Sequence, residues 1–146
     1  MEIKQITSVD EIERLLANFN HDFPRTLHHR VGDLGGYATK LAQNALVYVA
    51  GEGERILGFI ACYANDTAWK KAYLAQIAVS ADCRNKGIGK TLLNLVCKRA
   101  VQYGMQTIWL EVDLSNMEAI TYYTKNGFVV MGGDSLVSQL MMKELI

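Results

Sequence analysis

Two glycines and three basic side chains make residues 84–90 the part of the chain best suited to bind an anion. The segment reads Arg84-Asn85-Lys86-Gly87-Ile88-Gly89, and Lys90 follows it. It comes after an apolar run over 72–79 and leads into a helical pattern. N–H groups at a helix N-terminus lack partners within the helix, and glycine lets a bulky anion approach the backbone. The sequence therefore predicts a diphosphate cradle where a strand gives way to a helix.

Two common nucleotide-binding motifs do not fit this segment. A Walker A loop requires glycine five positions before Gly89, where Arg84 stands. The Rossmann fingerprint requires a third glycine at the position of Leu92. Because Gly89-Lys90-Thr91 still resembles the end of a Walker A loop, a nucleotide-binding phosphotransfer protein stays open as an alternative.

A second segment, over 107–128, has its own pattern of chemistry-bearing residues. Apolar and polar side chains alternate over 107–113, as in a strand with one buried face. The two faces carry Ile108, Leu110 and Val112 on one side, and Trp109, Glu111 and Asp113 on the other. Ser115 and Glu118 predict a capping box that opens a short helix, and Gly127 is placed to end it.

Together the two segments resemble the GNAT superfamily of N-acetyltransferases. The first matches the acyl-CoA diphosphate loop Q/R-x-x-G-x-G/A, and the second matches L-E-V-x-x-x-N-x-x-A-x-x-x-Y-x-x-x-G-F. They come in the order and at the spacing that the family shows, and the resemblance covers nearly the whole chain. It implies an acetyl-CoA-dependent enzyme.

The resemblance also implies roles for individual residues. Tyr123 matches the general acid that protonates the CoA thiolate, and Asn116 matches the asparagine that hydrogen-bonds the CoA arm. Glu111 matches the base of ribosomal-protein N-terminal acetyltransferases, but those enzymes usually carry arginine where this chain has Asp113. The residues expected to contact the CoA moiety are Ile77, Ala78, Val79, Arg84, Asn85, Lys86, Gly87, Ile88, Gly89, Lys90, Asn116 and Tyr123.

Several other residues could take the acceptor amine's proton. His28 and His29 titrate near neutral pH and lie in the segment that borders the acceptor site in this family. Asp66 follows a strand end, where it could instead cap a turn. Cys83 has no histidine near it in the sequence, so we do not expect it to act as a nucleophile. We expect Glu111, helped by Asp113 or Asp66, to attract a primary amine.

The elements that must position these residues alternate between strands and helices. The predicted strands cover 1–6, 45–50, 56–64, 72–79, 107–113, 128–131 and 137–144, with a hairpin turn over 51–54. The predicted helices cover 8–20, 37–43, 90–103 and the segment after Ser115, and 21–36 is expected to be irregular. The resemblance implies an α/β (α+β) GNAT fold, with a mixed central sheet of about seven strands and about four helices.

Length and composition narrow the class of protein. With 146 residues, half of them apolar, the chain is long enough for one domain over 1–146. A net charge of zero argues against nucleic acid as a partner. No apolar run approaches the roughly 20 residues of a membrane span. The three cysteines lack metal-ligand spacing, so we expect no metal and a cytoplasmic protein. A homodimer is left open.

Three functions follow from these observations. The favoured one is an acetyl-CoA-dependent N-acetyltransferase that moves the acetyl group directly to a primary amine of a small molecule or a protein. The second is a CoA-binding sensor or interaction module without turnover. The third is the nucleotide-binding phosphotransfer protein.

Overall fold

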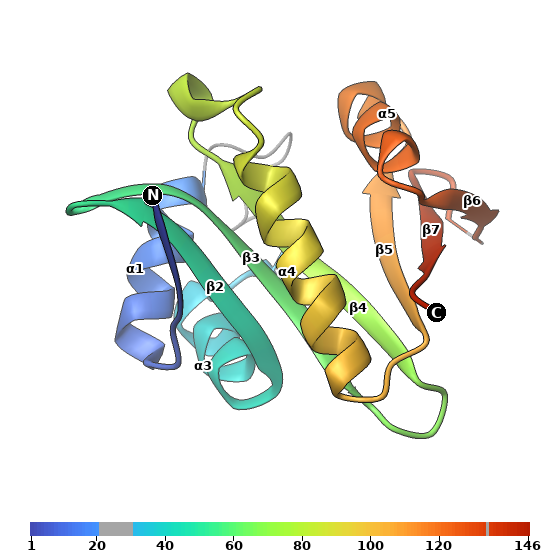
Figure 1. The fold of residues 1–146 in the computed structure, drawn as a ribbon, viewed down its shortest axis with the longest axis horizontal. Helices are drawn as coiled ribbons and strands as arrows, with labels where there is room; N and C mark the ends of the chain where they lie inside the picture. Colours follow the sequence, from blue (N-terminus) through green and yellow to red (C-terminus); the bar gives the residue numbers. More distant parts are fainter. Residues whose placement is uncertain (21–30, 134) are drawn as a thin grey trace.

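A computed structural model describes residues 1–20, 31–133 and 135–146. In this part of the chain, seven strands form one mixed sheet in the order β1-β2-β3-β4-β5-β7-β6 (Figure 1). The strands are β1 (Glu2–Gln5), β2 (Ala45–Glu52), β3 (Arg55–Asp66), β4 (Lys71–Val79), β5 (Thr107–Asp113), β6 (Val129–Gly132) and β7 (Ser138–Glu144). The helices are α1 (Val9–Phe19), α3 (Leu34–Asn44), α4 (Ile88–Gln102) and α5 (Met117–Lys125), with a 3₁₀ turn over Ala81–Cys83. The predicted fold class and the predicted order of elements are confirmed.

The sheet opens between its two central strands. β4 and β5 run parallel and pair only near their beginnings, from Lys71 with Thr107 to Tyr73 with Trp109. Past that point the two strands diverge (Figure 1), while β5 stays paired with β7 over its whole length. The C-terminal part of β4, after Tyr73, therefore has one edge that no described strand covers.

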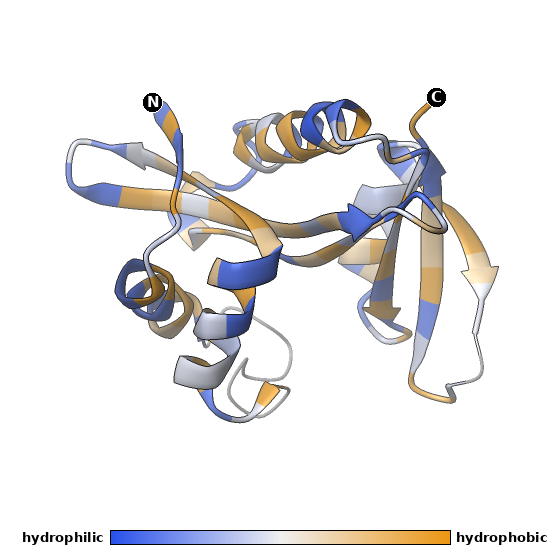
Figure 2. Cartoon of the chain, turned by 90° about the horizontal axis from the view of Figure 1, so that it is seen from below, coloured by the Kyte–Doolittle hydropathy of each residue, from blue (hydrophilic) through white to orange (hydrophobic). Residues whose placement is uncertain are grey.

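Helices cover the sheet on both faces (Figure 2). α4 packs on one face, where Leu92, Leu93 and Val96 belong to the same buried cluster as Ile60 and Ile108. α1 and α3 pack on the opposite face against β2 and β3. The predicted alternation in β5 is confirmed, since the side chains on the α4 side are 0–5% exposed: Ile108, Leu110 and Val112.

A β-bulge in β4 lies at the start of the opening. Leu74 pairs with Cys62 and Gln76 pairs with Ala61, so the register skips Ala75. The extra residue reverses the alternation of side chains. Leu74 packs on the α4 side, whereas the buried Gln76 faces α3 and donates from Nε2 to the Tyr37 hydroxyl at 3.1 Å.

Two helices start earlier than predicted. α3 begins at Leu34, three residues before Tyr37, because the Asp33 carboxylate accepts from the Gly35 N–H at 3.1 Å and caps the helix. α4 begins at Ile88, two residues before Lys90. The predicted irregular segment is therefore wrong over 34–36, and both helices begin among glycines, which have low helix propensity.

The start of α5 differs from the predicted capping box. Asn116 is the N-cap, and its Oδ1 accepts from the Ala119 N–H at 3.2 Å. The Ser115 hydroxyl instead donates to Asp113 Oδ1 at 2.7 Å, as does the Ser115 N–H at 3.0 Å. Asp113 thus draws Ser115 into the turn before the helix. The predicted end at Gly127 is confirmed, with φ +94°.

The hairpin turn between β2 and β3 is tighter than predicted. β2 continues through Glu52 and β3 starts at Arg55, so the turn consists of Gly53 and Glu54 alone. Gly53 has φ +62°, which suits glycine in a two-residue hairpin.

Candidate active site

A cavity of about 1350 Å³ lies where β4 and β5 diverge. Its wall combines β4 from Tyr73 to Val79, the loop before α4, the end of β5 and the inner side of α5. Both predicted catalytic residues, Glu111 and Tyr123, line this cavity, as do nearly all residues expected to contact CoA. The opening of the sheet therefore brings together motifs that are distant in the sequence.

The segment over 84–89, called the glycine loop below, leaves helix amides open at the cavity. Gly87 is the N-cap of α4 with φ +82°, and Asn85 is also left-handed with φ +65°. The first helical bond runs from the Thr91 N–H to the Gly87 carbonyl at 3.0 Å. No side chain of the described residues caps α4. The N–H groups at 88–90 can therefore bind an anion.

The two glycines of this loop are required for different reasons. A Cβ on Gly87 would have no described atom within 4 Å, so its left-handed φ is what demands glycine. A Cβ on Gly89 would lie 3.0 Å from the Tyr122 hydroxyl and 3.6 Å from Val79 Cγ2. Gly89 thus permits the close contact between α4 and α5, a reason that the sequence pattern did not indicate.

Tyr122 is a site residue that the sequence motifs did not single out. Its hydroxyl is buried against Gly89 and has no hydrogen-bond partner within the described residues. Burial raises the pKa of Tyr122, so the phenol stays neutral. An unpartnered buried hydroxyl costs about 1–3 kcal/mol. The only sequence signal was its position beside Tyr123, because the contact joins segments more than 30 residues apart.

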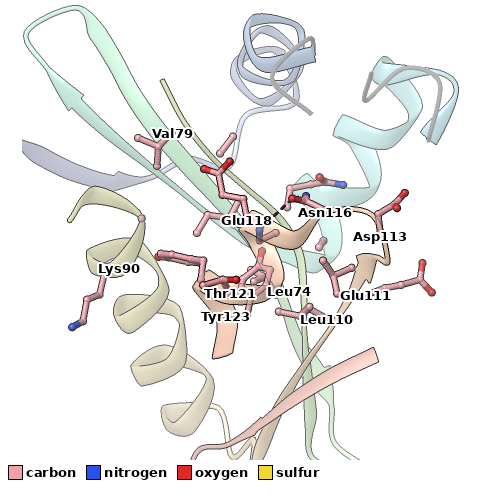
Figure 3. A pocket seen from close by; sticks show the side chains of 18 of the residues that line it. Leu74, Val79, Lys90, Leu110, Glu111, Asp113, Asn116, Glu118, Thr121 and Tyr123 are labelled. Carbon is pink, nitrogen blue, oxygen red and sulfur yellow. Dashed lines mark hydrogen bonds between the residues drawn. The ribbon is translucent and has the colours of Figure 1, made fainter. Parts of the chain in front are cut away.

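The basic residues of the loop are exposed, and one has a structural contact. Arg84 Nε donates to the Val79 carbonyl at 3.2 Å, which ties the loop to the end of β4. Lys86 is exposed, and the Lys90 side chain points away from Tyr123 (Figure 3). Cys83, beside the loop, is 4% exposed, which fits a packed thiol.

The end of β4 offers backbone groups to the cavity. Ile77, Ala78 and Val79 pair with β3 on one side only, since the pairing with β5 stops at Tyr73. In an antiparallel pair, alternate residues turn their N–H and C=O groups away from the partner strand. The groups that β4 turns away from β3 can bind an extended ligand in the way that a neighbouring strand would, apart from the Val79 carbonyl, which accepts from Arg84. This geometry agrees with the expected CoA contacts of these residues.

Tyr123 is held in the cavity wall by two aromatic neighbours. Its ring centroid lies 5.5 Å from that of Phe128 and 5.6 Å from that of Tyr122, both in edge-to-face arrangements. Such packing fixes the ring plane. Two helical turns earlier, the oxygen of the Asn116 amide caps α5, so the amide nitrogen is the group that Asn116 can offer to a ligand.

Glu111 lies on the other face of the sheet from Tyr123. Tyr123 packs with the α4-side cluster, whereas Glu111 and Asp113 alternate with the buried face of β5. Figure 3 shows both carboxylates pointing away from Tyr123. Glu111 is exposed, while Asp113 is engaged with Ser115 in the turn before α5. The opening between β4 and β5 connects the two faces.

Of the other candidate bases, Asp66 is described, and it is not brought to this cavity. It is the last residue of β3, its Oδ1 accepts from the Trp69 N–H in the following turn at 3.0 Å, and it lines a second, smaller cavity. Its predicted alternative role as a turn cap is confirmed. His28 and His29 lie outside the described residues.

Metal-binding clusters and membrane-spanning helices are both absent from the described ranges 1–20, 31–133 and 135–146. No group of three His, Cys, Asp or Glu side chains there could hold a metal ion. No helix in the same part of the chain has the length and apolar character needed to cross a membrane.

Comparison with known families decides the class of this protein. Residues 10–128 match the model of the acetyltransferase (GNAT) family. The chain belongs to that family. The GNAT resemblance predicted from the two motifs is thus confirmed, and the cavity described above is the place where the family motifs meet.

The curated relatives are N-acetyltransferases with different acceptors. Over 89 residues the chain is 34% identical to the [ribosomal protein bS18]-alanine N-acetyltransferase of Escherichia coli (strain K12), covering 56% of this chain and 60% of that protein. Over 109 residues it is 31% identical to a streptothricin acetyltransferase of Streptomyces lavendulae, covering 74% and 56%. The chain thus spans less than two thirds of the length of these relatives.

Solved structures share the fold over the full length. The PaiA N-acetyltransferase from Thermoplasma acidophilum, solved in complex with coenzyme A, covers 99% of both chains with a TM-score of 0.77 and 21% identity. At this identity the likeness concerns the fold alone.

Proposed function

We propose that this chain is an acetyl-CoA-dependent N-acetyltransferase that passes the acetyl group directly to a primary amine, and that residues 1–146 form one such domain. The observation that carries the proposal is the cavity between β4 and β5, which connects the glycine loop with Tyr123 and Glu111. Binding energy from a long donor can be used to place its reactive end beside catalytic groups.

The donor would lie along the uncovered edge of β4. Its diphosphate would bind the free N–H groups at 88–90, and its arm would bond the backbone of Ile77, Ala78 and Val79. The Asn116 amide nitrogen would donate to the same arm. All these groups line one cavity, which supports the sheet opening as the site where the donor binds.

Transfer requires two proton movements. The amine nitrogen attacks the thioester carbonyl, the C–N bond forms and the C–S bond breaks. Glu111 would take the amine proton, directly or through a water, and Tyr123 would protonate the departing thiolate. Each proton transfer contributes roughly 10²- to 10⁴-fold to the rate. Since Glu111 and Tyr123 lie on opposite faces, the amine and the donor would meet in the opening from opposite sides.

Release of CoA across a panel of amines tests this function. The purified chain should release CoA from acetyl-CoA at a rate that rises with the concentration of at least one primary amine. Hydroxyl acceptors of the same shape should cause no release. Tight acetyl-CoA binding without release for any amine would instead support the sensor alternative. Absence of acetyl-CoA binding would overturn both.

A further inference from the structure

Three aromatic side chains form a row across the sheet on the face that carries Glu111. Tyr63 on β3 pairs with Tyr73 on β4, and Tyr73 pairs with Trp109 on β5. Directly paired residues share a face of the sheet, with Cβ atoms about 5 Å apart. The three rings, called the aromatic row below, are therefore neighbours across the base of the opening.

A second cavity of about 680 Å³ lies over the aromatic row. Lys40, Tyr63 and Tyr73 line both this cavity and the larger one, so the two cavities adjoin. Leu140 also lines the second cavity and is the residue that pairs with Glu111. A molecule with its amine at Glu111 therefore has room for the rest of its body over the aromatic row.

A lysine lies at each end of the aromatic row. Lys71 Nζ lies 4.6 Å from the ring centroid of Trp109, and Lys40 Nζ lies 5.8 Å from that of Tyr63. Asp66 also lines the second cavity, but its carboxylate accepts a hydrogen bond within the hairpin turn. Two lysine cations therefore lie near one carboxylate, and that carboxylate already accepts a hydrogen bond.

Beyond Trp109 along β5, the same face of the sheet carries the carboxylates of Glu111 and Asp113. Trp109 and Glu111 are two residues apart on β5, which is about 7 Å along a strand. Because Lys71 pairs with Thr107, Lys71 and Glu111 lie on opposite sides of Trp109 along the strand. The sheet face around the aromatic row is therefore positively charged on one side of Trp109 and negatively charged on the other.

Tyr63 supplies an independent sign that a ligand belongs here. The residue lines both cavities, and its hydroxyl is buried and has no hydrogen-bond partner among the residues described. Burial raises the pKa of Tyr63 to about 12, so the hydroxyl keeps its proton and can donate. A polar ligand over the aromatic row would give this donor an acceptor after a small side-chain adjustment.

We propose that the aromatic row is the acceptor subsite, a proposal that rests on the function proposed above. The acceptor is a primary amine joined by an apolar or planar spacer to an anionic group. The amine lies at Glu111, the spacer stacks on Tyr73 and Trp109, and the anion pairs with Lys71. Small aminoalkyl benzoates meet this description, as does a peptide N-terminus followed closely by an acidic residue. Polyamines do not, because their second cation would meet Lys71.

Matched acceptor pairs test this proposal. The small-molecule pair is 4-(2-aminoethyl)benzoate and its neutral benzamide. The peptide pair is alanyl-phenylalanyl-glutamate amide and the corresponding glutamine peptide. Spermidine serves as the polycation. In CoA-release assays, wild type should favour each accepted anionic probe over its neutral partner by about fivefold in kcat/KM, the size expected of a partly hydrated ion pair. The difference should lie in KM.

Substitutions at Lys71 decide whether this ion pair exists. Lys71→Gln should abolish the preference, Lys71→Arg should keep it, and Lys71→Glu should reverse it in favour of spermidine. Lys98→Gln, on the outer side of α4 and outside both cavities, removes the same charge and should keep the preference. Unchanged acetyl-CoA affinity in each variant would show that the fold is intact.

The outcomes separate this proposal from the function beneath it. Equal use of anionic and neutral probes by wild type, or a preference that survives in Lys71→Gln, would overturn the acceptor class and leave the acetyltransferase function standing. Absence of CoA release with every amine would overturn both. A preference seen in one pair alone would identify the acceptor as a small molecule or as a peptide.

Discussion

Tyr122 and Tyr123 are adjacent residues whose side chains have different surroundings. The Tyr122 hydroxyl is buried against Gly89, whereas the Tyr123 ring packs between Tyr122 and Phe128 at the cavity wall. The two residues therefore form a natural pair for testing which hydroxyl takes part in the chemistry.

Removing each hydroxyl should have opposite consequences. Tyr123→Phe should lower kcat by about 10²-fold or more and leave acetyl-CoA affinity nearly unchanged, because a general acid acts in the transition state. Tyr122→Phe should keep kcat and raise the free energy of unfolding by up to about 1 kcal/mol, since it deletes an unpartnered buried hydroxyl. Steady-state kinetics and denaturant titration measure both. Equal kcat in Tyr123→Phe and wild type would make Tyr123 a packing residue.

Glu111 can be tested through the pH dependence of the reaction. If it takes the amine proton, Glu111→Gln should lower kcat/KM most at low pH and less as the pH rises, because more of the amine then arrives already deprotonated. The measurement is a kcat/KM profile for one amine in both proteins, with Lys98→Gln as the control. Parallel profiles would move attention to His28 and His29.

For single residues, the sequence predicted which side chains belong to the site better than it predicted what those side chains contact. Tyr123, Glu111 and the glycine loop line one cavity, as the motifs indicated. The role of Gly89 could not be predicted, because it depends on Tyr122, which reaches it only after α5 folds back against α4. Asp66 was ambiguous and the capping box of Ser115 was wrong for a similar reason: short polar side chains bond the nearest backbone or side-chain partner, and that choice depends on local geometry.

The start of α4 is the element on which donor binding depends. Gly87 has a left-handed φ and lines the cavity, and a Cβ added there would meet no described atom within 4 Å. Gly104, just past the end of the same helix, also has a left-handed φ and open space, but it does not line the cavity. The two glycines share a backbone requirement and differ in their position relative to the ligand.

Substituting these two glycines should separate stability from binding. Gly87→Ala and Gly104→Ala should each lower the free energy of unfolding by about 1–2 kcal/mol, the cost of a left-handed alanine. Gly87→Ala should weaken acetyl-CoA binding at least tenfold, whereas Gly104→Ala should leave it unchanged. Gly87→Asn should recover stability, since Asn tolerates this conformation, and still bind weakly. Calorimetry that shows equal affinity in folded Gly87→Asn would contradict the role of the bare backbone.

Element types were predictable from the sequence, and element starts were less so. The sequence predicted every β-strand and α-helix that the structure describes, but not the 3₁₀ turn over Ala81–Cys83. The starts of α3 and α4 were missed because glycines at their first turns have low helix propensity. Asp33 caps α3 and the glycine loop starts α4, so local capping and turn geometry outweigh propensity there.

For the molecule as a whole, donor binding should appear as a rise in melting temperature. A ligand at 100 times its dissociation constant stabilises the folded state by about 2.7 kcal/mol. For a chain of this length that is roughly 5–10 °C. Acetyl-CoA and CoA should both produce the shift, while ATP with magnesium should not. A shift with ATP alone would favour the phosphotransfer alternative.

The overall architecture followed from the resemblance, but the geometry of the opening did not. No pattern in the sequence stated that β4 and β5 would part after Tyr73, or that Ala75 would form a bulge there. Both are properties of the pairing between strands, which alternation within one strand does not indicate. The aromatic row was equally hidden, since Tyr63, Tyr73 and Trp109 become neighbours only through strand register.

The parting of β4 and β5 has a consequence for amide hydrogen exchange. In the free protein, N–H groups on the uncovered edge of β4 should exchange with solvent deuterium faster than those bonded to β3, although both belong to one central strand. Acetyl-CoA should slow exchange selectively on that edge over 74–79. The central strand of this sheet would then behave as an edge strand until its substrate arrives.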